Sequence, residues 1–449
     1  MQARQVVLIS LIVCFILPIA CAVDVVINPV PSPNGAVLLI VDGFGSCYFY
    51  PEFVPHDLDG NELMRGEANN IMLIADGGVR VLDITAPQPR TALGHSVLVT
   101  GYSHADPLLV GFDDATIFDA TRKHNYLCIG VMQKGDFESL RAKQDGILFD
   151  SSNSIKTPTA KLEVNAQVPA DVIELMQEWQ NDLPSYLDGK EGVERYTAYN
   201  RWGIDASDAI ARYMCDNHPD RKFLLTVNVG AVDLAGHHMG PERYIELIGE
   251  LDEDVCNLYL TCLENNLALI ITADHGMAFA MTEKGRYVGG HASDKYAGAV
   301  ESQRIPLIVS SPNIRIGVID GTYGQEDVAP TLLSILDVPE ALQYSDGDII
   351  PVKKYANLRV IAESPIKITL QNNDATLYSI TDEDVTFVGL TLGNYTVSTG
   401  RRTMSVNLRS DQVIEIETSS YDRTVLAAMM ISMIMVGGGL TIRRIMRED

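Results

Sequence analysis

The chain has 449 residues and a formal net charge of −25 at pH 7, because 59 Asp and Glu outnumber 34 Lys and Arg. Hydrophobic residues make up 46% and charged residues 21%, a globular composition that excludes a disordered or fibrous protein. So acidic a chain lacks the basic face with which a non-specific nucleic-acid binder neutralises phosphates. The length allows two or three domains, and seven cysteines without a Cys-x-x-Cys pair exclude a disulfide scaffold and a structural zinc knuckle.

The N-terminal segment is typical of a secretory signal. Arg4 precedes an apolar stretch over 6–19, and small residues follow at 20–22. A short positive start, an apolar stretch and small residues at a cleavage point predict a signal peptide over 1–22. A buried strand or an uncleaved anchor is the alternative interpretation. Five cysteines remain after cleavage, and this odd number implies at least one free thiol or an intermolecular bond.

The C-terminal segment is typical of a membrane anchor. Residues 425–442 form an uncharged apolar stretch of 18 residues, which is long enough to span a bilayer. Arg443, Arg444 and Arg447 follow it. By the positive-inside rule, these arginines predict a cytoplasmic tail over 443–449. The region between the two apolar segments is therefore expected outside the cytoplasm, on a single-pass membrane protein.

Apolar runs and helical patterns alternate between these ends as far as about residue 350. The run over 36–41 is typical of a strand buried on both faces of a parallel sheet. Similar runs cover 79–84, 127–131, 223–229, 267–271 and 305–309, and helical patterns cover 206–215, 242–263 and 327–336. We therefore predict an α/β domain over 23–350, with a mostly parallel sheet flanked by helices. Its polar segment 147–203 is interpreted as an insertion or cap over one edge of the sheet.

The pattern changes after residue 350 to short runs, several of them alternating, that turn residues separate. These runs cover 358–361, 366–370, 376–380, 385–390, 395–399, 404–408 and 412–416. They predict a small all-β sandwich over 351–424, between the α/β domain and the membrane span. Asn394 begins an Asn-x-Thr glycosylation motif on an expected turn.

Asp and His follow several predicted strands, in turns that are rich in small residues. They are Asp42, Asp233, His237, Asp274 and His275, while His291 precedes the run over 305–309. A single Asp-Gly is most simply a turn, and a single His is more often structural. Ligands bind beyond the carboxyl ends of the strands in an α/β sheet, so these residues together predict a metal centre. Mixed carboxylate and imidazole ligands suit zinc or manganese, whereas an all-oxygen set would suit calcium or magnesium.

Thr91 lies in a turn just before an apolar helix that we expect over 92–99. A hydroxyl residue at this place can be a plain N-cap. Beside metal ions, the same hydroxyl can ionise and act as a nucleophile, and the helix N-terminus favours a bound anion. The residues alone leave both interpretations open.

These motifs together resemble the alkaline phosphatase superfamily over 36–339, in the order that the family shows. Asp42 matches in IVDGFG, Thr91 matches the nucleophile, and the pair in ADHGM matches Asp274 and His275. The string DLAGHHMGP over 233–241 is similar to the nucleotide pyrophosphatase/phosphodiesterases and to the ethanolamine-phosphate transferases of GPI-anchor synthesis. The string DVAPTLLSILDVP resembles a late helix of the family's core.

The resemblance implies a two-metal centre that holds zinc or manganese. One ion would be held by Asp233, His237 and His291, and the other by Asp42, Asp274, His275 and the oxygen of Thr91. It further implies a phospho-threonine intermediate, which water or an acceptor hydroxyl attacks. His238 matches no family position, and we expect it in an outer contact or facing solvent.

Departures from the family patterns narrow the substrate class. Thr91 does not begin the Cys/Ser-x-Pro-x-Arg motif of sulfatases, and Gly94 stands where the nucleotide phosphodiesterases have an Asn that contacts phosphate. Gly94 and His95 instead match the Gly-His pair of the cofactor-independent phosphoglycerate mutases and the GPI transferases. We therefore expect a membrane-anchored, extracytoplasmic phosphoesterase or phosphotransferase that acts on a phosphate ester.

Two alternatives remain. A phosphoglycerate-mutase-like phosphotransferase would need a cytosolic sugar-acid substrate, against which the signal and the anchor argue. A non-enzymatic cell-envelope protein could be built on a degenerate phosphatase fold, but the complete set of Asp and His ligands argues against this second alternative.

Overall fold

The computed structural model describes residues 22–134, 137–152, 154–373, 375–400 and 402–416. The chain divides into two units, an α/β unit over Val30–Tyr355 and a β unit that combines residues up to Pro29 with those from Ala356. The predicted span over 425–442 lies outside the described residues, as does the predicted signal peptide except for residue 22. Among the residues that are described, none of the helices has both the length and the apolar character that a bilayer crossing requires.

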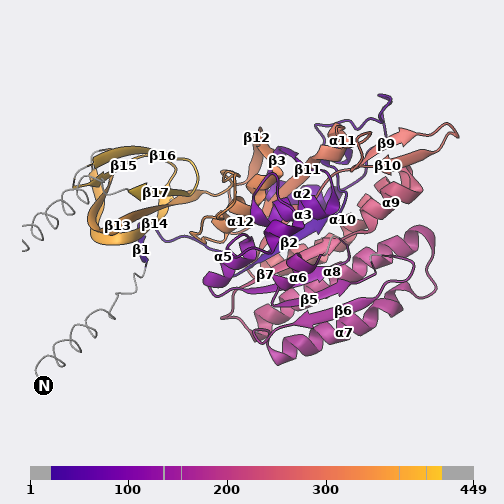
Figure 1. The fold of residues 1–449 in the computed structure, drawn as a ribbon, viewed down its shortest axis with the longest axis horizontal. Coiled ribbons are helices and arrows are strands. Elements are labelled where there is room, and N and C mark those ends of the chain that lie inside the picture. The colour runs from indigo at the N-terminus through magenta and orange to yellow at the C-terminus, as the bar shows by residue number, and fades with distance from the viewer. Residues whose placement is uncertain (1–21, 135–136, 153, 374, 401, 417–449) are drawn as a thin grey trace, which may run out of the picture. The chain divides into compact units, whose positions relative to one another are not determined.

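A nine-stranded sheet in the order β12-β3-β11-β8-β2-β7-β4-β5-β6 forms the centre of the α/β unit (Figure 1). In chain order its strands are β2 (Ala36–Val41), β3 (Val79–Thr85), β4 (Leu127–Met132), β5 (Gly146–Asp150), β6 (Ala160–Val164), β7 (Phe223–Val229), β8 (Ala268–Thr272), β11 (Arg304–Ser310) and β12 (Gly317–Gly324). Only β11 and β6 run against the common direction of this sheet. The predicted mostly parallel sheet is therefore confirmed.

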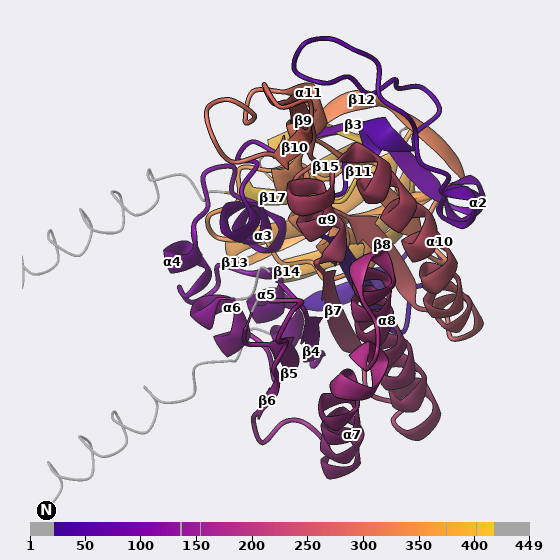
Figure 2. The same ribbon diagram turned by 90° about the vertical axis from the view of Figure 1, so that its right-hand side faces the viewer.

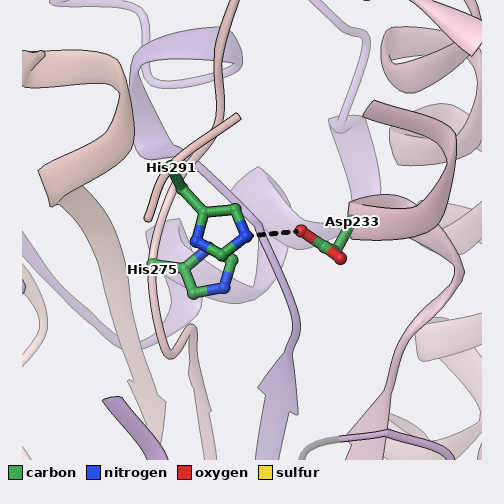
Figure 3. Close-up of side chains that lie close together, drawn as sticks. All are labelled: Asp233, His275 and His291. Carbon is green, nitrogen blue, oxygen red and sulfur yellow. Dashed lines mark ion pairs between the residues drawn. The ribbon is translucent and has the colours of Figure 1, made fainter. Parts of the chain in front are cut away.

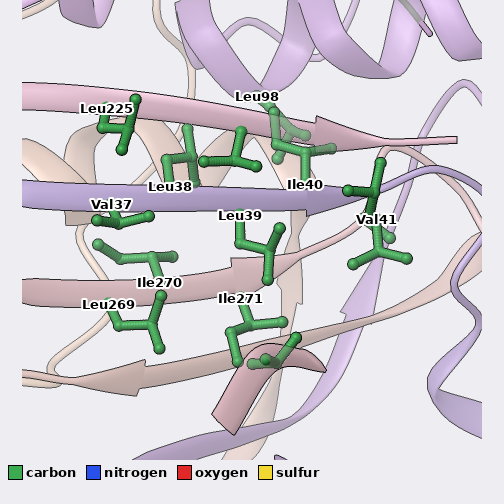
Figure 4. Close-up of a cluster of buried hydrophobic side chains, with 14 of the residues drawn as sticks. Val37, Leu38, Leu39, Ile40, Val41, Leu98, Leu225, Leu269, Ile270 and Ile271 are labelled. Atoms are coloured by element: carbon green, nitrogen blue, oxygen red, sulfur yellow. The ribbon is translucent and has the colours of Figure 1, made fainter. Parts of the chain in front are cut away.

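The central strand β2 is buried along its whole length. Its side chains alternate between the two faces of the sheet, so both faces must be covered. Figure 4 shows Leu38, Leu39 and Ile40 among apolar side chains of the neighbouring strands, including Leu225 of β7 and Ile271 of β8. A continuous apolar run predicts this environment, because a strand with one wet face would alternate with polar residues.

Helices cover both faces of the sheet, in two groups whose members contact one another. One group contains α2 (Asn69–Gly77), α7 (Ala170–Leu187), α8 (Gly192–Asn217) and α10 (Pro241–Glu264). The other contains α3 (Thr91–Thr100), α4 (Pro107–Val110), α5 (Ile117–Lys123), α6 (Glu138–Ala142) and α12 (Val328–Ile335). Figure 2 shows strands of the sheet between α3, α5 and α6 on one side and α8 and α10 on the other. This layering is the predicted α/β architecture.

The segment 147–203 is not a cap, which corrects the sequence interpretation. Strands β5 and β6 extend the sheet itself, and α7 packs against α8 in the helical layer. Helix α7 buries only a narrow stripe, formed by Val172, Met176, Leu183 and Leu187. Because most of its other residues are polar, the composition of this segment concealed a helix that belongs to the body of the fold.

The described residues of the β unit form one six-stranded sheet rather than the two sheets of the predicted sandwich. Its strands are β1 (Val23–Val26), β13 (Tyr355–Asn372), β14 (Ala375–Thr391), β15 (Gly393–Thr399), β16 (Arg402–Leu408) and β17 (Gln412–Ile416). Runs predicted as separate strands are continuous within β13 and β14. They were divided because exposed residues typical of turns, such as Glu-Ser-Pro at 363–365, lie within the strand. Strand β1, expected in the α/β domain, pairs with β14 instead, and Asn394 lies exposed on β15 rather than on a turn.

Five cysteines lie in the described part of the chain, and all of them are free thiols. They are Cys47, Cys128, Cys215, Cys256 and Cys262. The expectation of at least one free thiol is met, and disulfides contribute nothing to the stability of the described units.

Burial on both faces makes the central strand sensitive to truncation. Leu39→Ala is expected to lower the free energy of unfolding by about 2–5 kcal/mol, because it leaves a cavity in a packed core. Urea denaturation measures this loss. The matched control is Leu73→Ala on α2, where Leu73 is 71% exposed and the expected change stays within about 0.5 kcal/mol. Equal small losses in the two variants would contradict the doubly covered sheet.

Candidate metal centre

Neighbouring parallel strands bring the predicted ligands to one edge of the sheet. Asp42 directly follows β2, and Asp274 and His275 follow the adjacent strand β8. On the other side of β2, strand β7 leads into α9 (Ala231–Met239), which carries Asp233 in its first turn. The carboxyl ends of parallel strands meet at the same edge, so these four side chains converge although they are far apart in sequence.

The buried Asp and His side chains form two overlapping groups, in each of which the possible ligand atoms lie within 4.8 Å of one another. The first group is Asp233, His275 and His291, and the second is Asp42, Asp274 and His275. In Figure 3 the Asp233 carboxylate faces the His291 ring, which stacks on His275 with 3.5 Å between the ring centroids. An open catalytic site holds an ion with about three protein ligands, so each group has the size of a metal site.

His237 joins the first group from the same helix as Asp233. The two residues are four apart in α9, so they share one face of the helix. His237 Nε2 lies 3.3 Å from Asp233 Oδ1 and 3.1 Å from His291 Nε2. His275 contributes to both groups, whereas the family resemblance assigned it to one. The neighbouring His238 is exposed and belongs to neither group.

Backbone carbonyl groups orient the rings of His237, His275 and His291. Each Nδ1 lies within hydrogen-bonding distance of a carbonyl oxygen: His237 of Gly289 at 3.1 Å, His275 of Gly276 at 2.9 Å and His291 of Pro89 at 2.8 Å. A carbonyl only accepts, so we assign the ring proton to Nδ1 in all three. The lone pair of each Nε2 is then available toward the carboxylates. Outer contacts of this kind orient metal-binding histidines.

The three carboxylates are fully buried, and they lack sufficient hydrogen-bond donors. Both oxygens of Asp42, Oδ1 of Asp233 and Oδ2 of Asp274 have no hydrogen-bond partner. Buried charges are unfavourable unless they are paired or bind a metal. Divalent cations would supply the missing positive charge, and the mixture of carboxylate and imidazole fits zinc or manganese. The residues present therefore fit a metal centre.

Lys134 contacts the candidate ligands, and the sequence interpretation missed it. Its Nζ lies 3.5 Å from Asp42 Oδ2 and donates a hydrogen bond to Asp233. Burial alone would lower the pKa of Lys134, but the two carboxylates outweigh it and raise the pKa above its ordinary value. The side chain therefore stays charged. Its place just beyond β4, at the same edge of the sheet, was the available signal, but only Asp and His were sought there.

The surroundings shift the pKa values of the individual candidate ligands in different directions. Burial raises the pKa of Asp42 well above its ordinary value, and the Asp274 carboxylate raises it further. Burial opposes the ionisation of Asp274, but His275 and His95 outweigh it and lower the pKa of Asp274 to about 2. Burial lowers the pKa of His291 to about 4. The His291 ring is therefore neutral at pH 7, which is the form that binds a metal.

Thr91 is the first residue of α3 and not its N-cap, which is Arg90. Its Oγ1 lies 3.1 Å from His275 Nε2, at the border of the second group. Gly94 allows α3 to come this close, because a Cβ there would lie 2.2 Å from the Asp274 carbonyl oxygen. His95 Nδ1 lies 2.8 Å from the Thr91 carbonyl oxygen and 3.4 Å from Asp274 Oδ2. The Gly-His pair therefore packs the start of the helix against the metal ligands.

The turn that carries Asp42 is held by a buried tyrosine. The Tyr244 hydroxyl donates a hydrogen bond of 2.7 Å to the Gly43 carbonyl and accepts one of 3.1 Å from the Gly45 N–H. It thereby satisfies two backbone groups that would otherwise be buried without a partner. The turn keeps its shape without a hydrogen bond to the carboxylate of Asp42, which remains directed at the site.

Comparison with known families and proteins finds similarity over parts of the chain. The family model described as Metalloenzyme superfamily matches residues 196–340. This range contains the ligands from α9 and β8 and also His291. Curated relatives include 2,3-bisphosphoglycerate-independent phosphoglycerate mutases. The one from Gracilaria tenuistipitata var. liui is 28% identical over 119 residues, which is 26% of this chain and 21% of the relative. The one from Anaplasma marginale (strain St. Maries) is 28% identical over 128 residues, or 28% of this chain and 24% of the relative. The chain thus spans about a quarter or less of these relatives.

Solved structures in the comparison are more distant. The wild-type alkaline phosphatase PafA gives a TM-score of 0.49 at 13% identity, over 72% of this chain and 99% of that chain. A protein in the alkaline phosphatase superfamily from Vibrio parahaemolyticus gives 0.45 at 15% identity, over 84% of this chain and 81% of that chain. TM-scores this low carry no argument about activity. The family match covers about a third of the chain, so residues 196–340 are similar to the family described as Metalloenzyme superfamily.

Proposed function

We propose that this protein is a two-metal phosphoesterase or phosphotransferase whose nucleophile is Thr91. One observation carries the proposal: buried carboxylate oxygens without hydrogen-bond partners meet the Nε2 atoms of three histidines, and the Thr91 hydroxyl lies beside them. Lys134 approaches only Asp42 Oδ2 among these oxygens, at 3.5 Å, so a single lysine cannot balance three buried carboxylates. A hydroxyl at such a border is suited to nucleophilic catalysis.

The reaction follows from the groups that border the site. Two zinc or manganese ions held by the Asp and His groups would lower the pKa of the Thr91 hydroxyl and stabilise the leaving oxygen. Thr91 Oγ1, after losing its proton to solvent, forms the bond to phosphorus. The ester oxygen leaves with the bonding electron pair and takes a proton from water. Lys134 holds a phosphoryl oxygen with its ammonium group, and the N-terminus of α3 favours the bound anion. Water or an acceptor hydroxyl then attacks phospho-Thr91 and restores the free threonine.

A phosphoglycerate-mutase-like activity is the second candidate. It is favoured by the Gly94-His95 pair at the start of α3 and by the similarity to mutases over about a quarter of the chain. In that reaction the acceptor would be another hydroxyl of the same sugar acid, so no free phosphate would be released. The two candidates share the chemistry of Thr91 and differ only in the acceptor of the phosphoryl group.

A screen of phosphate esters tests the proposed function. The purified full chain is expected to hydrolyse an aryl phosphate ester, to lose this activity on treatment with a chelator, and to regain it with Zn²⁺ or Mn²⁺. Release of the aryl alcohol and of phosphate measures the reaction. Interconversion of phosphoglycerates without phosphate release would favour the mutase. No reaction with either class of substrate, or full recovery with Ca²⁺ alone, would refute the proposal.

Substitution of Thr91 distinguishes a catalytic nucleophile from a residue with only a structural role. Thr91→Ala is expected to lower kcat by more than about tenfold, because a loss below about 1.4 kcal/mol of transition-state stabilisation is too small for a missing nucleophile. Thr91→Ser should retain part of the activity and should still form a phospho-enzyme. Rate and melting temperature are measured on the same samples. Activity of the alanine variant near that of the wild type would exclude the covalent mechanism.

We also propose that the α/β unit lies outside the cytoplasm, anchored by the segment 425–442. The proposal is supported by the apolar stretches over 6–19 and 425–442 and by the arginines that follow the second. Protease added to intact cells is therefore expected to degrade the region 23–424. A cytoplasmic protein in the same cells serves as the control for lysis. Full protection of the α/β unit in intact cells, with cleavage after permeabilisation, would contradict this location.

A further inference from the structure

Helix α9 begins without a capping side chain of its own, although it carries two of the candidate metal ligands. Asp233 lies in its first turn, and His237 follows one turn later. The first N–H groups of a helix have no partner within the helix, and a Ser, Thr, Asp or Asn at the N-cap usually accepts from one of them. Here the N-cap is Gly230, which has no side chain that could accept a hydrogen bond.

Lys134 explains why the N-cap is a glycine. A Cβ at Gly230 would lie 2.7 Å from the Cβ of Lys134, which is closer than two such atoms approach in proteins. The Lys134 ammonium group pairs with Asp233 in the same place. The lysine therefore occupies the space that a capping side chain would need, so a cap for α9 has to come from another part of the chain.

Two buried amides supply this cap. Asn200 of α8 accepts a hydrogen bond of 3.0 Å at Oδ1 from the Ala231 N–H. Gln133, just beyond β4, accepts one of 3.1 Å at Oε1 from the Gly230 N–H. Both side chains are buried, with 1% and 0% of their surface exposed. A buried amide is unfavourable unless it is hydrogen-bonded, so these contacts account for its presence in an otherwise apolar interior.

The two amides are themselves held in place by α8. The Tyr199 hydroxyl lies 2.9 Å from the main-chain carbonyl oxygen of Gln133, and Gln133 Nε2 donates to the Tyr199 carbonyl. The same hydroxyl contacts Asp150 Oδ2 at 2.7 Å, at the end of β5. The start of α9 is thereby tied to α8 and to the ends of two strands. A shift of α9 along its axis would break hydrogen bonds in the interior of the protein.

We propose that Asn200 and Gln133 are positioning residues, which cap α9 from outside and thereby hold Asp233 and His237 in register for their metal ion. Each amide accepts from a backbone N–H at the start of α9, so each acts through the helix. The inference rests on the metal centre of the proposed function. It predicts that loss of the cap weakens one metal site selectively, because the ligands after β2 and β8 are held by other contacts.

Titration of the metal-free full chain with Mn²⁺ tests this role. The wild type should show two binding steps, which His237→Gln and Asp274→Asn assign to the two groups. Asn200→Leu removes the acceptor at similar size and should weaken the step of the Asp233 and His237 group by about 10- to 100-fold. The step of the Asp42 and Asp274 group should change by less than about threefold, since its ligands do not lie on α9.

Two further variants distinguish positioning from general stability. Asn200→Asp keeps the acceptor oxygen, and the Nδ2 that it replaces has no hydrogen-bond partner, so both binding steps should remain at least as tight as in the wild type. Asn313 is a matched control, because it is an equally buried amide that donates to the Ile335 carbonyl at 2.8 Å. It follows β11 at the end of the sheet where β8 begins, away from the candidate ligands. Asn313→Leu should lower the melting temperature and leave both Mn²⁺ steps unchanged.

These experiments distinguish a failure of the positioning role from a failure of the proposed function. The positioning role alone would be overturned if Asn200→Leu bound both ions as the wild type does or weakened both steps equally. Loss of the binding step of the Asp233 and His237 group in Asn200→Asp would overturn it as well. A wild type that binds no Mn²⁺ or Zn²⁺ would overturn the metal centre and the inference with it. If Asn200→Leu gives no soluble protein, Asn200→Ala removes the same acceptor with less bulk and is judged by the same two binding steps.

Discussion

Three carboxylates share one buried space at the edge of a parallel sheet, and the rest of the site is arranged around their charge. Asp42, Asp233 and Asp274 are held there by the backbone of β2, α9 and β8, so they cannot move apart without disturbing the centre of the fold. Like charges at this separation repel strongly where water is excluded. Lys134 compensates part of the charge. The remaining negative charge lies on carboxylate oxygens that have no hydrogen-bond partner. A pair of divalent cations is the simplest chemical means of balancing this charge.

The surroundings of the carboxylates are fixed as firmly as the carboxylates themselves. Backbone carbonyls orient the histidine rings, Tyr244 holds the turn after β2, and amides from α8 and β4 hold the start of α9. Gly94 and Gly230 let α3 and Lys134 come within a distance that any other residue would prevent. Such support limits the reorganisation that a site undergoes when it binds an ion or a transition state, and it explains why polar side chains are buried there.

Local signals allowed much of this arrangement to be predicted from the sequence. The strand β2 could be recognised from its continuous apolar run, and the Asp and His ligands from their places after strands. Lys134 had the same signal, because it lies just beyond β4, but its pairing with Asp233 depends on a residue distant in sequence. Asn200 had no such signal, because an asparagine within a helix gains its role only from neighbours that are distant in sequence. The long strands of the β unit were divided because exposed residues such as Glu-Ser-Pro at 363–365 are typical of a turn. Helix α7 was missed since its buried stripe is narrow.

The most direct test of the account is to locate metal ions in crystals of the protein grown with Zn²⁺, using anomalous diffraction at the zinc edge. Two peaks per chain are expected. One should lie between Asp233, His237 and His291, and the other between Asp42, Asp274 and His275, close to Thr91 Oγ1. Lys134 should then be directed at the open side of the ions. Crystals with saturating Zn²⁺ and no anomalous peak among these side chains would contradict the central claim that the buried carboxylates form a metal centre.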